Sequence, residues 1–109
     1  VQAAHQYGAA VPGVKPKDSL KIRQGGMIRE DVDRESLIAV QTPQVFPFEE
    51  YDAALGYCVE QHRICTDDAA VYAVLQKPIH IVEGDYRNIK VTTPEDVAIA
   101  EMFLREDFV

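Results

Sequence analysis

The chain has 109 residues, is 47% hydrophobic and carries a formal net charge of -7. This length suits one compact domain or one half of a larger domain, and the apolar content is enough to build a core. The acidic balance argues against a general nucleic-acid binder, because such proteins need a basic surface to release phosphate counterions. No apolar run approaches the length of a membrane span and no basic-then-apolar leader opens the chain, so we expect no membrane contact and a cytoplasmic location.

Cysteines and histidines give no sign of a metal site. Cys58 and Cys65 are too few and too far apart in sequence for a disulfide framework or a C-x-x-C motif, so we predict two free thiols in a reducing compartment. His5, His62 and His80 share no ligand spacing with one another or with the cysteines. We therefore predict no metal ligands among these residues.

The first segments alternate between helix and strand signals. Residues 1–7 lack a methionine and are typical of the last turns of a helix that ends at Gly8, so we expect a chain cut from something longer. Residues 9–14 are small and apolar and predict a strand, which the following Lys15-Pro16 ends.

A β-hairpin arm is predicted next, between Ser19 and Val32. Two alternating segments flank Gly25-Gly26, and this pattern predicts one apolar face. The residues expected on that face are Leu20, Ile22, Ile28 and Val32. Because a two-stranded ribbon is marginal in water, the face needs cover from the domain body or from another chain. A dimerisation arm is therefore one hypothesis.

The middle of the chain predicts an α/β architecture. Residues 37–42 are apolar and predict a buried strand, and apolar residues at helical spacing predict a helix over 47–62. A shorter helix is predicted over 69–75, with either Thr66 or Asp67 as its N-cap. The apolar run 79–82 predicts another buried strand.

The stretch from Glu83 to Asp96 presents a single lysine. Thr93 and Pro94 mark a helix start and Asp96 suits a capping box, so we predict a helix from Pro94 packed on a sheet. Lys90 is predicted on a short strand, pointing away from its two apolar neighbours. Such a lysine can bind phosphate, but a solvated lysine has the same pattern and is the commoner case.

No glycine-rich nucleotide loop, nucleophile elbow or Ser/His/Asp set is present in the 109 residues. Five motifs nevertheless occur together and in order. They are Lys17-Asp18-Ser19-Leu20-Lys21, Val32-Asp33-Arg34, Ala39-Val40-Gln41-Thr42-Pro43-Gln44-Val45-Phe46, Thr66-Asp67-Asp68-Ala69, and the run from Val82 to Asp96. Taken together they closely resemble the C-terminal half of the 2-C-methyl-D-erythritol 4-phosphate cytidylyltransferase family.

This resemblance implies a fold and a domain organisation. It implies a Rossmann-like α/β nucleotidyltransferase domain with a protruding β-arm at about 17–33 that interlocks with the arm of a second copy in a homodimer. Residues 1–109 would be the C-terminal part of that single domain. The glycine-rich CTP-binding loop and the magnesium-binding aspartate of the family lie in its N-terminal half, so we expect the chain alone to be inactive.

The resemblance also implies roles for five residues. Ser19, Arg34, Thr42, Thr66 and Lys90 fall on substrate-binding positions of the family, and Lys90 falls on its catalytic, phosphate-holding lysine. Ser19 stands where the family has threonine, which keeps the hydroxyl and loses the methyl. Because Arg34 stands at the foot of the arm, we expect it to serve the site of the partner subunit.

The implied reaction joins CTP to methylerythritol phosphate with loss of pyrophosphate, requires magnesium and belongs to the non-mevalonate route to isoprenoids. Two alternatives stay open. One is the related ribitol phosphate cytidylyltransferase. The other is a non-catalytic interaction module that keeps the arm without the chemistry.

Overall fold

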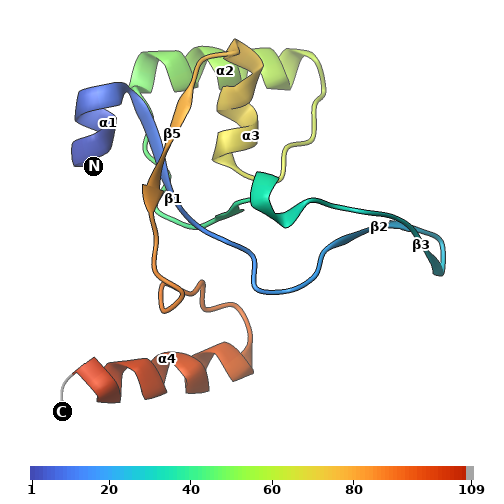
Figure 1. The fold of residues 1–109 in the computed structure, drawn as a ribbon. Helices are drawn as coiled ribbons and strands as arrows, with labels where there is room; N and C mark the ends of the chain where they lie inside the picture. The colour runs from blue at the N-terminus through green and yellow to red at the C-terminus, as the bar shows by residue number, and fades with distance from the viewer. Residues whose placement is uncertain (108–109) are drawn as a thin grey trace.

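Two strands that are far apart in the sequence form the centre of the structure, a computed structural model that describes residues 1–107. β1 (Ala9–Val14) pairs in parallel with β5 (Ile79–Glu83). β4 (Ala39–Val40) lies antiparallel on the other edge of β1, which gives the strand order β4-β1-β5. Figure 1 shows this small sheet with helices above it and a hairpin at its side. The α/β class is as predicted.

The helices next to the sheet supply part of the core, and Ala9, Ala10 and Val11 of β1 supply the rest. α1 (Gln2–Tyr7) ends at Gly8, whose φ of 100° suits only glycine. α2 (Phe48–Glu60) packs against α3 (Asp68–Tyr72) and the 3-10 helix η2 (Ala73–Leu75) that continues it. The core of this pair consists of Ala54, Cys58 and Val71. Cys58 and Cys65 are both free, as predicted.

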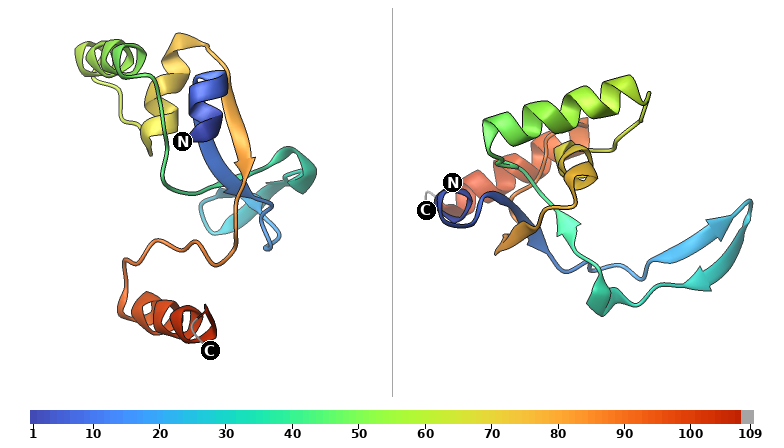
Figure 2. Two further views of the ribbon diagram at one scale, coloured as in Figure 1. Left: turned by 90° about the vertical axis from the view of Figure 1, so that its left-hand side faces the viewer. Right: turned by 90° about the horizontal axis from the view of Figure 1, so that it is seen from above.

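The predicted arm is present as β2 (Lys21–Gln24) and β3 (Met27–Asp31), joined at Gly25-Gly26. Figure 2 shows it projecting away from the helices. A β-bulge shifts the register after Ile22, so that Arg23 lies opposite Ile28. Because a bulge changes the phase of side-chain alternation, the single continuous apolar face predicted from the sequence is wrong. Ile28 is 68% exposed.

α4 (Pro94–Asp107) begins where the sequence predicts. The Asp96 carboxylate accepts hydrogen bonds from the backbone amides of Thr92 and Thr93, and Thr93 Oγ1 accepts from the Asp96 amide. The pKa of Asp96 lies below its usual value, because the Thr92 amide, the Thr92 hydroxyl and the Thr93 amide all donate to its carboxylate. These bonds form the predicted capping box.

The predicted packing of α4 on the sheet is wrong. Figures 1 and 2 show the helix apart from the strands, because the chain leaves the sheet after β5 and runs through an irregular segment before α4 begins. Phe103 is half-buried, but four other apolar side chains of α4 are 40–55% exposed: Val97, Ile99, Met102 and Leu104.

Two predicted buried strands are less buried than expected. The strand predicted over 37–42 is reduced to the two exposed residues of β4. In β5, Ile81 is 57% exposed and Val82 42%. Both strands lie at the edges of the three-stranded sheet, so each has a neighbouring strand on one side only.

The described chain is open in shape. Its radius of gyration is 16.8 Å, whereas a compact chain of this length has about 13 Å. The arm and α4 both protrude, as Figure 2 shows, and account for the difference. Within residues 1–107, no helix is both long enough and apolar enough to cross a membrane.

The α2 core gives a direct test of this packing. Ala54 is fully buried and Ala53, one residue earlier on the same helix, is exposed. Ala54→Leu should lower the free energy of unfolding by about 1–3 kcal/mol, because the packed core has no room for three extra carbons. Ala53→Leu should change it by less than about 0.5 kcal/mol. Urea denaturation measures the free energy of unfolding of both variants. Equal losses in the two would contradict the burial of Ala54 in the core.

Candidate functional site

The five predicted site residues are all exposed and lie outside the regular strands. Ser19 precedes β2, and Arg34 opens the short 3-10 helix η1 (Arg34–Ser36). Thr42 follows β4, and Thr66 stands two residues before α3.

Lys90 lies in the irregular segment between β5 and α4, so its predicted strand is wrong. A turn interrupts the chain after β5, with the Asn88 amide donating to the Asp85 carbonyl over 2.9 Å. Residues 84–93 consequently add no strand to the sheet.

The segment Gln41-Thr42-Pro43-Gln44 binds the segment that carries Lys90. Gln41 Nε2 donates to the Asp85 carbonyl over 2.8 Å. Asn88 Nδ2 donates in the opposite direction, to the Thr42 carbonyl, also over 2.8 Å. Thr42 and the Lys90 segment are thereby held side by side.

The same segment also binds the start of α3. Gln44 Oε1 accepts from the Ala69 amide over 2.9 Å, and Gln44 Nε2 donates to Asp67 Oδ2 over 3.2 Å. Asp67 Oδ1 accepts from the Ala70 amide over 2.8 Å, so Asp67 is the N-cap. Of the two N-caps predicted for α3, Asp67 is therefore confirmed, and the prediction of Thr66 is wrong. The amides of Ala69 and Ala70 already have partners and are not open to a phosphate.

Ser19 and Arg34 form a second group, at the foot of the arm. Arg34 Nη1 donates to the Lys17 carbonyl over 3.0 Å, two residues before Ser19. The Tyr86 hydroxyl donates to the Lys15 carbonyl over 2.7 Å, and Lys17 Nζ lies 4.1 Å from the centre of the Tyr86 ring. Tyr86 therefore joins the foot of the arm to the Lys90 segment.

Several cationic side chains lie around these two groups, interspersed with acidic ones such as Asp33 and Asp85. Lys15 lies 3.4 Å from Glu35, but both side chains are more than 70% exposed, so the pair is weak. Lys90 makes no hydrogen bond or ion pair with another described residue, which leaves its ammonium group available to an anion. The arrangement can therefore hold phosphate groups with positive charge and with hydroxyls.

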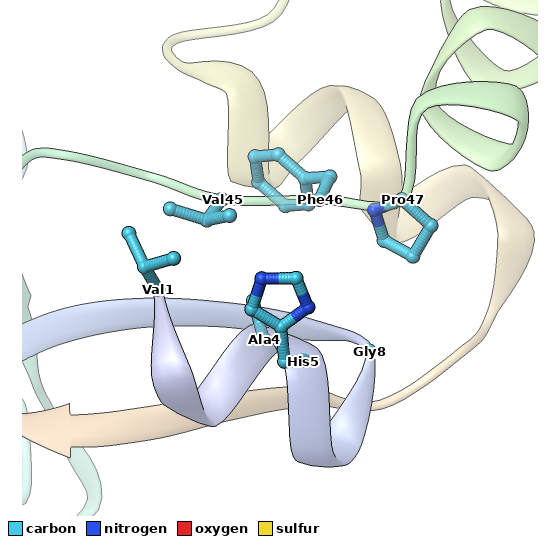
Figure 3. A pocket seen from close by; sticks show the side chains of 7 residues that line it. All are labelled: Val1, Ala4, His5, Gly8, Val45, Phe46 and Pro47. Carbon is cyan, nitrogen blue, oxygen red and sulfur yellow. The ribbon is translucent and has the colours of Figure 1, made fainter.

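Two hollows of the surface differ in whether they adjoin the five predicted site residues. Figure 3 shows one of about 400 Å³ between α1 and residues 45–47, with the His5 ring directed toward Phe46 and Pro47. None of the five predicted residues lines it. The other, of about 390 Å³, is lined at the foot of the arm by Lys15, Lys17, one acid, Asp18, and by Tyr86 and apolar residues. The second adjoins Ser19 and is the better place for an anionic ligand.

The residues present do not form the magnesium site that the sequence resemblance implies. In the part of the chain that the structure describes, no group of three or more His, Cys, Asp or Glu side chains is placed to hold a metal ion. No chemical step is therefore assigned to a metal bound by this chain.

The residues that organise the site were missed as functional residues in the sequence. Gln41, Gln44, Asn88 and Tyr86 appear there only as members of motifs. One available signal is the pair of glutamines that flank Thr42-Pro43, since amide side chains beside a turn can bind the backbone of irregular segments.

Comparison with known proteins shows matches over nearly the whole chain. Residues 1–106 match the family model of 2-C-methyl-D-erythritol 4-phosphate cytidylyltransferase. The chain is 47% identical over 104 residues to the enzyme of that name from Geobacillus kaustophilus, covering 95% of this chain and 46% of the relative. It is 42% identical over 106 residues to the enzyme of the same name from Lysinibacillus sphaericus, covering 97% of this chain and 46% of that relative. The chain thus spans about half the length of the curated relatives it matches.

Solved structures agree in fold. The chain superposes with a TM-score of 0.83 and 34% identity on 2-C-methyl-D-erythritol 4-phosphate cytidylyltransferase from Thermus thermophilus, covering 96% of this chain and 52% of that one. It also superposes with a TM-score of 0.83, at 27% identity, on 4-diphosphocytidyl-2C-methyl-D-erythritol synthase from Anaerococcus prevotii. This match covers 95% of this chain and 49% of that one. These likenesses confirm the predicted nucleotidyltransferase type of α/β fold.

Gly84 tests how tightly the site segments pack. A Cβ at this position would collide with Gln41 Oε1 and would lie 3.1 Å from the Gly13 carbonyl oxygen, so Gly84→Ala should cost about 1–3 kcal/mol of unfolding free energy. The matched control is Gly56→Ala in α2, where a Cβ meets nothing and should stabilise the helix by about 0.5–1 kcal/mol. Urea denaturation compares them. A neutral Gly84→Ala would show that the contact is loose.

Proposed function

Because the chain belongs to the 2-C-methyl-D-erythritol 4-phosphate cytidylyltransferase family, we propose that the complete protein transfers a cytidylyl group from CTP to methylerythritol phosphate and releases pyrophosphate. This is a step of isoprenoid precursor synthesis by the non-mevalonate route. The observation that carries the proposal is the family match over residues 1–106. The relatives compared above are all described as methylerythritol enzymes, which favours this substrate over ribitol phosphate.

The proposal extends to the parts that this chain does not contain. Residues 1–109 act as the C-terminal part of a single cytidylyltransferase domain, and the CTP-binding loop and magnesium ligands belong to the other part. A homodimer forms through the arm, which is supported by the exposure of Met27 (76%) and Ile28 (68%) on its second strand. The cytoplasmic location stays a prediction from composition.

The proposed reaction proceeds by direct attack without a covalent enzyme intermediate, so the protein contributes mainly positioned charge. A phosphate oxygen of methylerythritol phosphate attacks the α-phosphorus of CTP, and the bond from that phosphorus to pyrophosphate breaks. Negative charge is spread over the phosphoryl oxygens in the transition state, where fixed cations stabilise it. Lys90 supplies such a cation, and its ammonium has no competing partner among the described residues.

The other predicted residues orient the substrate. Thr42 and Thr66 offer hydroxyls from segments that Gln44 links by hydrogen bonds. Ser19 and Arg34 act from the foot of the arm, where a guanidinium can bind a phosphate through two parallel hydrogen bonds. Hydroxyl donors and a planar cation are suited to a phosphorylated polyol.

Replacing Lys90 tests the catalytic role. In the complete protein, Lys90→Ala should lower kcat by about 10²–10³-fold, since one positioned donor at a developing charge contributes roughly 3 kcal/mol. The control is Lys77→Ala, which removes a lysine that pairs with Glu50 away from the site and should leave kcat unchanged. Pyrophosphate release with CTP, methylerythritol phosphate and magnesium is the assay. A wild-type protein without turnover would refute the proposed function.

Subunit mixing tests whether Arg34 acts in the partner's site. Arg34→Ala and Lys90→Ala proteins, each nearly inactive, should regain part of the activity when their subunits exchange. A heterodimer then has one site with both residues intact, provided that Arg34 reaches across the dimer. If exchange is demonstrated and activity stays at the level of the separate variants, Arg34 acts within its own subunit.

A further inference from the structure

Gln41 is anchored to the sheet at its backbone and reaches the Lys90 segment with its side chain. Its amide nitrogen donates to the Pro12 carbonyl of β1 over 2.9 Å. Its side chain binds both backbone polar groups of Asp85. Nε2 donates to the Asp85 carbonyl over 2.8 Å, and Oε1 accepts from the Asp85 amide over 3.4 Å. The absence of a side chain at Gly84 makes this approach possible.

Gln44 makes the corresponding contacts on the other side of Thr42-Pro43. Its side chain binds the Asp67 carboxylate and the Ala69 amide, which flank the start of α3 directly after Thr66. Next to it, Val45 and Ala10 of β1 exchange two backbone hydrogen bonds of 2.9 and 3.0 Å. The four-residue segment is therefore tied to the central strand at both ends.

We propose that Gln41 and Gln44 are positioning residues that form an amide clamp, in which one side chain orders the Lys90 segment and the other the Thr66 segment around Thr42. The inference rests on the proposed function of the site, and it assigns a role to two residues that need not touch substrate. Asn88 reinforces the first half of the clamp from the opposite side, by donating to the Thr42 carbonyl.

The physical need for such a clamp follows from the state of Lys90. Lys90 is exposed, lies in an irregular segment and has no hydrogen bond or ion pair with any described residue that would fix it. Its position therefore depends on the backbone that carries it. Displacement of a reacting or stabilising group by about 1 Å can cost on the order of 10²-fold in rate.

The first arm of the test measures order and does not depend on activity. Gln41→Met in the complete protein keeps the length of the side chain and removes its hydrogen bonds. Amide hydrogen exchange over residues 84–90 should rise about tenfold, because two hydrogen bonds that restrain the segment are lost. Exchange in β1 and α2 should stay at the wild-type rate. The matched control is Gln61→Met, at an exposed glutamine without a side-chain hydrogen bond to the described residues. It should leave amide exchange at the wild-type rate both over residues 84–90 and in β1 and α2.

The second arm measures coupling to Lys90. Gln41→Met should lower kcat about tenfold with little change in KM, since the interaction affected is one made in the transition state. In a Lys90→Ala background the same substitution should lower kcat by less than about twofold, because a residue that acts through Lys90 has nothing left to position. A role in general stability would instead give the same loss in both backgrounds.

Each outcome decides the matter. Faster exchange confined to residues 84–90, together with non-additive loss of kcat, supports the clamp. Unchanged exchange overturns it, and so does a loss of kcat that is additive with Lys90→Ala. If Gln41→Met fails to fold, Asn88→Ala replaces it, since Asn88 is exposed and joins the same two segments. An inactive wild-type protein overturns the proposed function, whereas the exchange arm still shows whether the clamp exists.

Discussion

The parallel pairing of β1 with β5 is the constraint on which the rest of the structure depends. It places Ala9 opposite Ile79 and Gly13 opposite Glu83, residues that are 70 positions apart. Gly84 continues the ladder by donating to the Gly13 carbonyl over 2.9 Å. The segments that follow the two strands consequently start side by side, and ligands of open α/β sheets bind beyond the carboxyl ends of the strands. Tyr86 and Lys15 meet at this place.

The site is built mainly from side-chain bonds to backbone, because the segments that form it are irregular. Backbone groups outside helices and sheets still need partners, and short amide side chains supply them. Each such bond contributes only about 1 kcal/mol. The order of the candidate site therefore depends on several exposed or part-buried bonds acting together, those of Gln41, Gln44 and Asn88 above all. This makes the site segments easier to loosen than the helical core.

The helical part is stabilised differently, by burial and by polar contacts between the helices, which include the bond from the Tyr51 hydroxyl to Asp68. Glu50 of α2 accepts from the Tyr72 hydroxyl and pairs with Lys77. The pKa of Glu50 lies below its usual value, first because of the bond with Lys77 and then because of that with Tyr72. Burial, followed by the bond with Glu50, raises the pKa of Tyr72 to about 12. The hydrogen bond from Tyr72 to Glu50 links α3 to α2, while the arm and α4 remain outside this packed region (Figure 1).

Local features of this protein were determined by the sequence alone. Helix bounds, the hairpin turn at Gly25-Gly26 and the Asp96 capping box depend on residues within a few positions of one another, and five short motifs were enough to indicate the family. The tertiary structure alone decided the exposure of β5, the irregular backbone at Lys90 and the choice of Asp67 over Thr66 as the cap. These outcomes depend on partners distant in sequence, such as Gln44 for Asp67 and Gln41 for Asp85. A local pattern contains no information about which distant backbone will lie beside it, and for that reason the sequence offered candidate site residues but not the bonds between the segments that carry them.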